Sequence, residues 1–340
     1  MKHIRITGVA NLKLSDIARL AGVSVTTASY VINGKAEQKR ISPATVERVQ
    51  AVVDEHGFKP NPQAAGLRSR QTRTLGFILP DLENPSYARL AKLLEQGARA
   101  RGYQLLIASS DDEPDSERQL LKLFRARRCD ALIVASCLPK EDDSLGQLLD
   151  EGLPVIAVDR VRDPRRFCSV VSDDRLACQQ LTRSLLQPAP RRIALLGARP
   201  DLPISAERSS GFHDALKGHT CEVLELQGED FSRECGQRLM ADLLQQGELP
   251  DVLITTAYVL LAGVLDALRE HGAWPERLRV GTFGDTQLLD FLPLPVNSMY
   301  QQHELIAEQV LGLALAAVER DVYEPGVRGV VRKLKQRIAL

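Results

Sequence analysis

From residue 74 onward, short apolar runs alternate with longer amphipathic segments along the chain. The runs are five to seven residues long and predict strands at 74–80, 103–108, 130–135, 154–158, 192–197, 221–226, 251–255 and 279–283. Continuously apolar strands separated by helices are typical of parallel sheets that helices cover on both faces. So many strands favour two successive α/β sheets.

The polar residues that follow these strands indicate where a ligand would bind, because ligands of such folds bind outside the carboxyl ends of the strands. That rule selects the loop before Phe212 and the stretches Asp81–Tyr87, Ser109–Asp112, Ser136, Asp159–Arg160, Thr255–Tyr258 and Gly284–Asp285. The chain lacks glycine-rich phosphate loops, a nucleophile elbow and the zinc motif H-E-x-x-H, and its 6 histidines are dispersed. We therefore expect a binding cleft and not an enzyme, with no cofactor and no metal.

The charge of the chain is unevenly distributed, although its net charge is zero. Residues 1–73 hold 12 Lys and Arg against 5 Asp and Glu, a net charge of +7, which leaves −7 for the remainder. A small basic unit ahead of an acidic one indicates an anionic partner for the first unit, and nucleic acid is favoured over a membrane surface.

Three short helices are predicted between residues 14 and 57. Ser15, Ser24 and Ser42 are the expected N-cap residues of the three helices. A three-residue turn containing Gly22 joins the first two helices, and the third packs across them, which is the helix-turn-helix plan. In the second helix, VTTASYVI, the residues expected to face inward are Ala28, Val31 and Ile32.

The other face of the second helix carries Val25, Thr26, Ser29 and Tyr30, and Asn33 lies at its end. In helix-turn-helix proteins, outward residues of this helix reach base edges in the major groove. We therefore predict that these five residues bind DNA. Val25 has no hydrogen-bonding group, so it can read only an apolar feature such as the methyl group of thymine.

A short basic link, residues 60–73, follows the three helices. A helix that begins at Asn61 and ends near Ser69 would be too short and too polar to be stable alone. It places Leu67 beside Arg68, a combination that suits minor-groove insertion, in which contacts to the bent duplex offset the unstacking of one base step. We predict a helix that orders on DNA; the alternative is a plain basic linker.

The sequence also bears on the cellular compartment. It has no apolar run of 18 residues, and its first 14 residues lack the apolar stretch of a signal peptide. The 6 cysteines show neither C-x-x-C pairs nor zinc-ligand spacing, which is typical of reduced thiols. We therefore expect a cytoplasmic protein that does not bind membranes.

The chain resembles the lactose-repressor (LacI/GalR) family of bacterial transcription regulators in two long stretches, LKLSDIARLAGVSVTTASYVING and PNPQAAGLRSRQTRTLGFILPDLENPSY. The resemblance extends from about Leu12 to the C-terminus. Within the family, PDLENPSY and TFGDTQLLDFL are similar to segments of regulators of fructose and central carbon metabolism. The resemblance therefore implies a DNA-binding regulator of that metabolism.

The resemblance also implies a fold: an all-α helix-turn-helix DNA-binding domain followed by an α/β periplasmic-binding-protein-like core of two doubly wound parallel-sheet subdomains. It places the DNA-binding domain at 12–59, the hinge helix and linker at 60–73, and the core at 74–340. Within the core, the N-subdomain is expected at about 74–171 and 300–325, and the C-subdomain at about 172–299 and 326–340. The implied assembly is a homodimer, or a dimer of dimers, on a near-palindromic operator.

Position by position, the resemblance assigns base reading to Val25, Thr26 and Tyr30, minor-groove insertion to Leu67, and effector contacts to Asp159, Arg208, Phe231 and the position of Gly284. This chain departs from the family's pattern at two places in the cleft. Many members have Asn-Asp where this chain has Ala257-Tyr258, and an aspartate where it has Gly284. Both changes remove polar groups that would bind a free sugar.

The remaining cleft residues favour a phosphorylated sugar. Guanidinium groups such as those of Arg160 and Arg208 suit phosphate, whereas carboxylates accept the hydroxyl groups of a sugar. The complete predicted effector site is Ser86, Ser136, Asp159, Arg160, Arg208, Phe231, Gly284 and Asp285. The alternatives are a surface salt bridge for Arg160 and an ordinary strand-end position for Ser136.

Fructose 1-phosphate is the expected effector, and its binding is expected to release the operator. Fructose 1,6-bisphosphate and a pentose phosphate are the alternatives within the same family. Two other classes share the predicted core, namely a sugar-binding protein for transport and an enzyme that acts on sugar phosphates. The basic helix-turn-helix unit disfavours the first, and the lack of a nucleophile–base pair disfavours the second.

Overall fold

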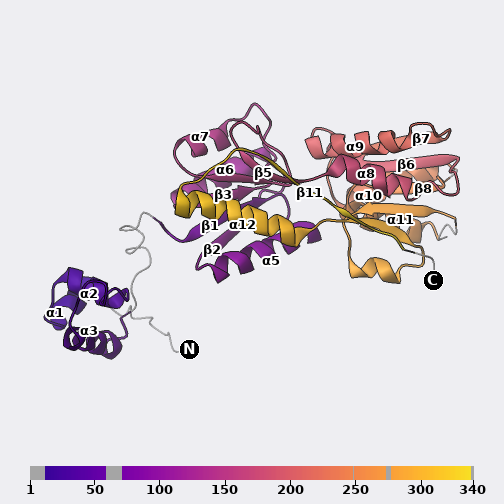
Figure 1. Cartoon of the computed structure of the whole chain (residues 1–340). Coiled ribbons are helices and arrows are strands. Elements are labelled where there is room, and N and C mark those ends of the chain that lie inside the picture. Colours follow the sequence, from indigo (N-terminus) through magenta and orange to yellow (C-terminus); the bar gives the residue numbers. More distant parts are fainter. Residues whose placement is uncertain (1–11, 59–70, 248, 273–276, 338–340) are drawn as a thin grey trace, which may run out of the picture. The chain divides into compact units, whose positions relative to one another are not determined.

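The computed structural model describes residues 12–58, 71–247, 249–272 and 277–337, and the chain divides into two units between Thr72 and Arg73. Each unit has a hydrophobic core of its own. Figure 1 shows helices alone in the first unit, whereas the second combines helices with two sheets. The predicted fold class, a helix-turn-helix domain followed by a core of two parallel sheets, is confirmed.

The first unit consists of α1 (Leu14–Leu20), α2 (Val25–Ile32) and α3 (Pro43–Glu55). Its core is formed by Ile17, Ala18, Ala21, Ala28, Val31 and Val49. The predicted N-cap of α1 is wrong, because the helix already begins at Leu14 and its N-cap is Lys13. The carboxylate of Asp16 accepts a hydrogen bond from the backbone N–H of Lys13 at 2.9 Å, so Ser15 is not needed as a cap.

The second unit contains two six-stranded sheets. The first sheet has the order β11-β5-β4-β3-β1-β2, with β1 (Thr74–Leu79), β2 (Gln104–Ser109), β3 (Ala131–Val134), β4 (Val155–Val158), β5 (Cys168–Ser172) and β11 (Gly326–Val330). The second has the order β12-β10-β9-β8-β6-β7, with β6 (Arg192–Ala198), β7 (Glu222–Gly228), β8 (Val252–Thr255), β9 (Arg279–Phe283), β10 (Val296–Tyr300) and β12 (Lys333–Lys335). All neighbouring strands are parallel except β12, which is antiparallel to β10.

Helices cover both faces of each sheet. On the first sheet, α5 (Pro85–Ala100) and α12 (His303–Arg320) pack on one face, and α6 (Pro114–Ala126) and α7 (Ser144–Asp150) on the other. On the second sheet, α10 (Arg233–Gln245) and α11 (Tyr258–Glu270) oppose α8 (Asp174–Arg183) and α9 (Pro203–Leu216). A short 3₁₀ helix, η1 (Gln287–Phe291), follows β9. Figure 1 shows α12 lying along the first sheet although it follows β10 of the second.

The chain crosses between the two sheets three times. It leaves the first sheet between β5 and α8, returns between β10 and α12, and leaves again between β11 and β12. The last crossing consists of Val331 and Arg332, because β11 pairs with β5 of the first sheet. It therefore lies after Val330 and not near residue 325, where the sequence places the subdomain boundary.

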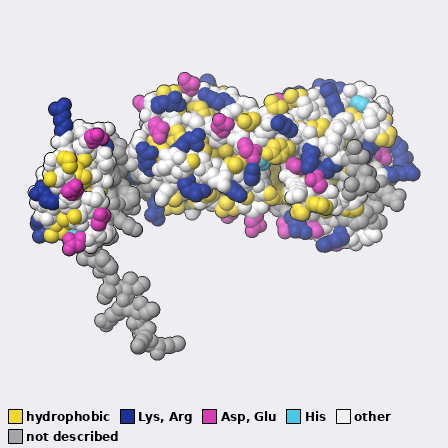
Figure 2. Space-filling model, turned by 60° about the horizontal axis from the view of Figure 1, so that its bottom comes forward, with side chains coloured by type: hydrophobic (Ala, Val, Ile, Leu, Met, Phe, Trp, Pro, Cys, Tyr) yellow, Lys and Arg dark blue, Asp and Glu magenta, His cyan; other side chains and the backbone are white. Residues whose placement is uncertain are grey.

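The surface of the second unit is mixed in character. Figure 2 shows acidic and basic side chains interspersed with apolar ones on the visible face. No helix among the described residues is both long and apolar enough to span a membrane.

Candidate DNA-reading helix and effector cleft

The sequence of α2 fixes where this helix begins and which face it exposes. The Oγ of Ser24 accepts a hydrogen bond from the backbone N–H of Thr27 at 3.0 Å, so Ser24 is the N-cap as predicted. Ala28 and Val31 are buried against the other helices. Val25 and Thr26 are exposed on the opposite face. The apolar side chain of Val25 is 40% exposed and is therefore available to a partner.

The far end of α2 is braced by polar contacts. The side-chain amide of Asn33 donates to the backbone carbonyl of Ser29 at 2.7 Å, which places Asn33 in a structural contact as well as on the predicted DNA face. Lys39 lies with its Nζ 5.3 Å from the centre of the half-buried Tyr30 ring. Two of the predicted DNA contacts, Leu67 and Arg68, lie outside the described residues.

The second unit contains a cavity of about 1080 Å³ at the carboxyl ends of strands from both sheets. The predicted effector residues that line it are Ser86, Asp159, Arg160, Arg208, Phe231, Gly284 and Asp285. Ser136 is not among the lining residues; it is buried, and its Oγ accepts a hydrogen bond from the backbone N–H of Leu138 at 3.2 Å. Ligand pockets are typically about 300–1,000 Å³, so this cavity is large enough to hold a small molecule.

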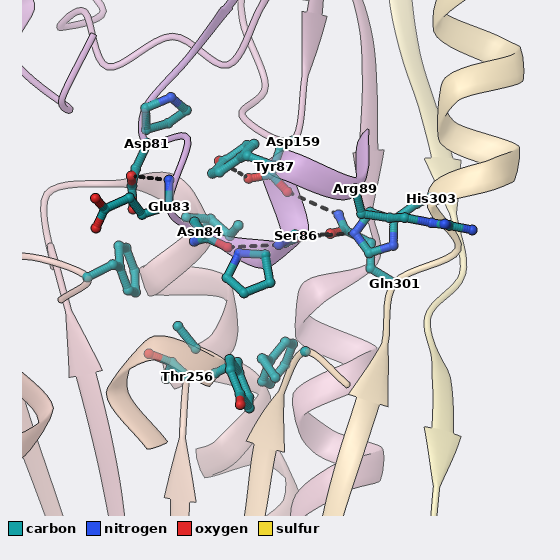
Figure 3. A pocket seen from close by; sticks show the side chains of 18 of the residues that line it. Asp81, Glu83, Asn84, Ser86, Tyr87, Arg89, Asp159, Thr256, Gln301 and His303 are labelled. Carbon is teal, nitrogen blue, oxygen red and sulfur yellow. Dashed lines mark hydrogen bonds between the residues drawn. The ribbon is translucent and has the colours of Figure 1, made fainter. Parts of the chain in front are cut away.

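Asp159, after β4, is the central hydrogen-bond acceptor of the cleft. Its Oδ2 accepts from the hydroxyl of Tyr87 at 2.7 Å, and its Oδ1 accepts from the amide of Gln301 at 3.2 Å. Figure 3 shows the Tyr87 hydroxyl directed at Asp159. Burial alone would raise the pKa of Asp159, but the charges of Arg332 and Arg208 and the Tyr87 hydrogen bond together lower it. The carboxylate is therefore held ionised, ready to accept the hydroxyl group of a ligand.

Backbone strain gathers at the same edge of the first sheet. Asp111, Asp112 and Asp159 all line the cavity, and their φ angles are 54°, 57° and 65°. Left-handed backbone in residues other than glycine costs free energy and is held in place by its surroundings. Such strain clusters at ligand sites, which agrees with a binding role for this edge.

Ser86, at the beginning of α5, joins two residues that follow β10. Its Oγ donates to the side-chain carbonyl of Gln301 at 2.8 Å and lies 2.9 Å from Nε2 of His303 (Figure 3). Because the single hydroxyl proton of Ser86 goes to Gln301, Nε2 of His303 acts as a donor to Ser86. Burial, followed by the charge of Arg332, lowers the pKa of His303 to about 4, so its ring is neutral.

One pair of arginines is neutralised by two carboxylates. Arg160, after β4, donates through both Nη atoms to Asp112 at 2.5 and 3.1 Å. Arg199, after β6, donates to the same Asp112 carboxylate at 2.8 Å and to both oxygens of Asp201 at 2.9 Å. We call these four residues the outer arginine group. It joins a loop of the first sheet to a loop of the second.

A second pair of arginines shares a single carboxylate. The Nε of Arg208, on α9, donates to Asp174 at 2.9 Å, and the Nε of Arg332 donates to the same oxygen at 3.1 Å. Both guanidinium groups lie over the ring of Phe283, at 4.4 and 5.2 Å from its centre. We call Arg208, Arg332 and Asp174 the hinge arginine group, because Asp174 and Arg332 lie at two of the crossings between the sheets.

The two departures from the family's pattern occupy one place in the structure. Gly284 has a φ of 90°, and a Cβ atom built on it would lie 3.0 Å from the Cβ of Tyr258. An aspartate at position 284 would therefore be strained and would press on Tyr258. The neighbouring Asp285 is held by Ser298, which donates to it at 2.7 Å, and by Arg337, which donates at 2.5 Å.

Some cleft residues were not anticipated from the sequence. Gln301, His303 and Arg332 line the cavity, and Asp174 orients two of its arginines. The first three follow strands β10 and β11, which the apolar pattern did not reveal. These residues could have been predicted from the expected two-sheet fold. The chain must cross between the sheets, and each crossing passes the cleft, so residues at the crossings are candidates for the site.

The chemistry of the cleft is that of binding. Its polar groups are guanidinium, carboxylate, amide and hydroxyl groups, most of them paired with one another. Among the described residues, no group of His, Cys, Asp and Glu side chains could hold a metal ion. Such an arrangement suits a small polar ligand that carries both hydroxyl groups and negative charge.

Two family profiles match the chain. The profile of periplasmic binding proteins and the sugar binding domain of the LacI family matches residues 72–315, and that of bacterial regulatory proteins of the lacI family matches residues 13–61. The fructose operon regulatory protein of Vibrio cholerae is 47% identical over 96% of this chain and 100% of its own. The catabolite repressor/activator of Escherichia coli K12 is 44% identical over 96% of this chain and 98% of its own.

Solved structures of similar fold include several that hold a ligand. The crystal structure of the Cra transcriptional dual regulator from Pseudomonas putida in complex with fructose 1-phosphate is 68% identical, with a TM-score of 0.76; it covers 78% of this chain and 99% of its own. The Lac repressor dimer bound to operator matches 96% of this chain and 98% of its own with a TM-score of 0.82, at 19% identity. The latter similarity concerns the fold alone.

Proposed function

Because this chain belongs to the LacI family of bacterial regulatory proteins, we propose that its cleft binds fructose 1-phosphate and that the bound effector releases operator DNA. The chain is a DNA-binding transcription regulator and not an enzyme, as its relatives over nearly the whole length are regulators of fructose and carbon metabolism. We propose the identity of its effector, the residues that bind it, and the consequence for DNA.

The observation that carries the proposal is the 68% identity with the Pseudomonas putida regulator whose structure holds fructose 1-phosphate. The cleft supports it with two kinds of group. Asp159 is an ionised acceptor for sugar hydroxyls, and buried guanidinium groups suit the phosphate. Ser86, Phe231, Gly284 and Asp285 complete the proposed wall of the site.

On the DNA side, we propose that Val25, Thr26, Ser29 and Tyr30 of α2 face the bases, with Asn33 at the helix end. Leu67 is proposed to enter the minor groove beside Arg68. Two copies of the chain then bind a near-palindromic operator, since half-sites mirror the symmetry of a dimer. The proposed location is the cytoplasm, where the operator is found.

We propose that release of DNA follows from closure of the cleft. Fructose 1-phosphate would bind the closed arrangement of the two sheets more tightly than the open one, and an effector shifts an equilibrium only by such a difference in affinity. Closure would move the first sheet, whose β1 continues from the hinge segment, and would separate the paired hinges of a dimer.

Isothermal titration of the full chain with fructose 1-phosphate, fructose 1,6-bisphosphate, a pentose phosphate and fructose tests the effector. We expect the tightest binding for fructose 1-phosphate and no measurable binding of fructose. Operator affinity is measured in parallel by fluorescence anisotropy with each sugar. Tighter binding of another phosphorylated sugar would replace the proposed effector, and binding that leaves operator affinity unchanged would refute the proposed release.

A further inference from the structure

The edge of the first sheet that lies away from the cleft is divided into two halves of different charge. The cleft lies at the carboxyl ends of the strands, so the segments that precede the strands lie at the opposite edge. The sheet order places β11, β5 and β4 on one half of this edge and β3, β1 and β2 on the other. Six carboxylates and three arginines precede β4, β5 and β11, in residues 150–154, 163–167 and 319–325. Six arginines and one carboxylate precede β1, β2 and β3, in residues 71–73, 99–103 and 125–130.

We call the six arginines that precede β1, β2 and β3 the basic edge. All six are exposed: Arg73, Arg99, Arg101, Arg125, Arg127 and Arg128. Backbone contacts hold the three segments side by side. The N–H of Gln104 donates to the carbonyl of Arg73 at 2.8 Å, and the N–H of Asp130 donates to the carbonyl of Thr74 at 2.7 Å. The positive charges therefore belong to one continuous surface.

Carboxylates neutralise part of the charge of the basic edge. Arg99 and Arg125 form exposed ion pairs with glutamates, at 2.9 and 2.8 Å, and such pairs contribute little free energy and are readily exchanged. The guanidinium group of Arg101 donates to the carbonyl of Gly97 at 3.0 Å. Neither Arg101 nor Arg127 forms an ion pair with a carboxylate among the described residues. The basic edge therefore retains positive charge that an anionic partner can bind.

A simpler explanation for these arginines is the charge of the helix ends, because a cation stabilises the last turn of a helix. The helices α5 and α6 end at this edge, and each has one arginine in its last turn, Arg99 and Arg125. The explanation does not extend to the arginines that follow each helix. It also fails for the other half of the edge, where α7 and α12 end but carboxylates outnumber arginines.

The basic edge surrounds the beginning of β1, which residues 59–73 join to the DNA-binding unit. Figure 1 shows β1 entering the first sheet at the end away from the second sheet. Residues 74–340 carry a net charge of −7, so a positive surface at this end runs against the charge of the rest of the second unit. The anion that the first unit brings to the protein is DNA, which carries one negative charge per about 1.7 Å of its axis.

We propose that the basic edge binds the sugar–phosphate backbone of operator DNA, so that the second unit adds a contact to those of α2. This inference goes beyond the proposed function, because it does not depend on which effector the cleft binds. Guanidinium groups form strong charged hydrogen bonds with phosphate oxygens. Contacts with phosphates raise affinity but carry no sequence information. The basic edge therefore strengthens binding to any duplex and leaves the reading of bases to α2.

Fluorescence anisotropy of the full chain at several salt concentrations tests the proposal. The probes are a labelled operator duplex, selected by wild type from a random pool, and a scrambled duplex of equal length. The double variant Arg101→Gln/Arg127→Gln removes two charges of the basic edge. The matched control is Arg183→Gln/Arg238→Gln, which removes two exposed arginines of the second sheet's helices that form no ion pair among the described residues.

The dependence of affinity on salt reports the number of phosphate contacts, because each contact contributes about 0.9 to the slope of log affinity against log salt. We expect the edge variant to reduce this slope by about 1–2 and to weaken operator binding about three- to thirtyfold at about 0.1 M salt. The scrambled duplex should lose the same factor, since a backbone contact is independent of sequence. The control variant should match wild type in slope and in affinity.

Two further measurements separate a phosphate contact from a merely structural role. Arg101→Lys/Arg127→Lys keeps both charges and should retain the salt slope of wild type, whereas a structural defect would not be rescued. Ethylation of single phosphates should reveal positions that weaken binding of wild type but not of the Gln variant. An unchanged slope in the Gln variant, an equal loss in the control, or a loss confined to the operator sequence would overturn the inference.

Discussion

At the scale of single residues, the cleft shows why its sequence departs from the family's pattern. The residues at positions 284 and 258 depend on each other. The backbone of Gly284 has a φ of 90°, and Tyr258 packs where a side chain at position 284 would lie. The aspartate that many relatives use would be strained at position 284 and would crowd Tyr258. The loss of that carboxylate agrees with a ligand that presents fewer hydroxyl groups on this side.

The variant Gly284→Ala should lower the free energy of unfolding by about 1–3 kcal/mol, because alanine is strained at a positive φ. Thermal or urea unfolding of the isolated variant measures this change. Gly312→Ala is the matched control: Gly312 lies within α12 with open space around its Cβ position, so alanine there should stabilise by about 0.5–1 kcal/mol. Equal effects of the two substitutions would contradict the strain at position 284.

The lowered pKa of His303 predicts that the free energy of unfolding of the second unit depends on pH. Burial lowers its pKa from 6.5 to about 4, so the unfolded chain binds a proton at a higher pH than the folded chain does. This residue's contribution is therefore complete above about pH 6.5 and is lost as the pH falls towards 4. At pH 5 the loss should be on the order of 1–2 kcal/mol.

Urea unfolding of wild type and His303→Gln between pH 7.5 and 5 measures the contribution, because glutamine can keep a hydrogen bond to Ser86 and does not titrate. The stability of wild type should fall more steeply than that of the variant. Parallel curves for the two proteins would show that His303 is not buried as a neutral ring.

Part of the candidate site can be predicted from local sequence pattern. Asp159 and Arg160 directly follow an apolar strand, so local pattern alone brings them to the edge of a sheet. Arg332 and Gln301 lie next to strands rich in polar residues, and their partners are more than 100 positions away. Contacts of this kind depend on the path of the chain between two sheets, which no short stretch of sequence specifies.

At the scale of elements, the predicted strands were the continuously apolar ones. The apolar pattern does not predict strands β5, β10, β11 and β12, because their sequences contain serine, asparagine, glycine or charged residues. In β10, for example, the buried Asn297 donates to Ser184 at 3.0 Å and the buried Ser298 donates to Asp285 at 2.7 Å. Polar residues are accommodated there by partners from distant segments, and β11 and β12 are edge strands that need little apolar surface.

The N-caps of α2 and α3 predict that the two helices differ in how much stability they lose when the N-cap serine is replaced. Ser24→Ala should destabilise the first unit by about 1 kcal/mol, because it removes the acceptor for the N–H of Thr27. Ser42→Ala should cost less, since the Oγ of Ser42 makes no cap hydrogen bond and contacts the hydroxyl of Thr45 instead. Hydrogen exchange of residues 14–57 in the full chain measures both, and an equal loss of protection would contradict the assigned caps.

At the scale of the whole molecule, each of the three crossings supplies a residue to the cleft or its support. Asp174 follows the first, Gln301 lies in the second, and Arg332 lies in the third. The amide of Gln301 also joins Asp159 to Ser172 at the end of β5. A ligand at Asp159 and the hinge arginines would therefore contact the connections between the sheets, so that the proposed closure would be coupled to its binding.

This coupling has a consequence that can be measured from either end. If fructose 1-phosphate lowers the affinity for operator by a given factor, then operator must lower the affinity for fructose 1-phosphate by the same factor, because both describe one coupling free energy. For allosteric proteins that factor is typically about 5–150.

Anisotropy of labelled operator measures how far fructose 1-phosphate lowers the affinity for operator. Titration of fructose 1-phosphate in the presence of saturating operator, and separately of a scrambled duplex of equal length, measures how far operator lowers the affinity for fructose 1-phosphate. A single pair of closed and open states predicts that the two factors agree and that Arg332→Gln reduces both together. Operator release without a matching loss of effector affinity would show that the sugar phosphate acts on DNA binding by a route other than closure of the cleft.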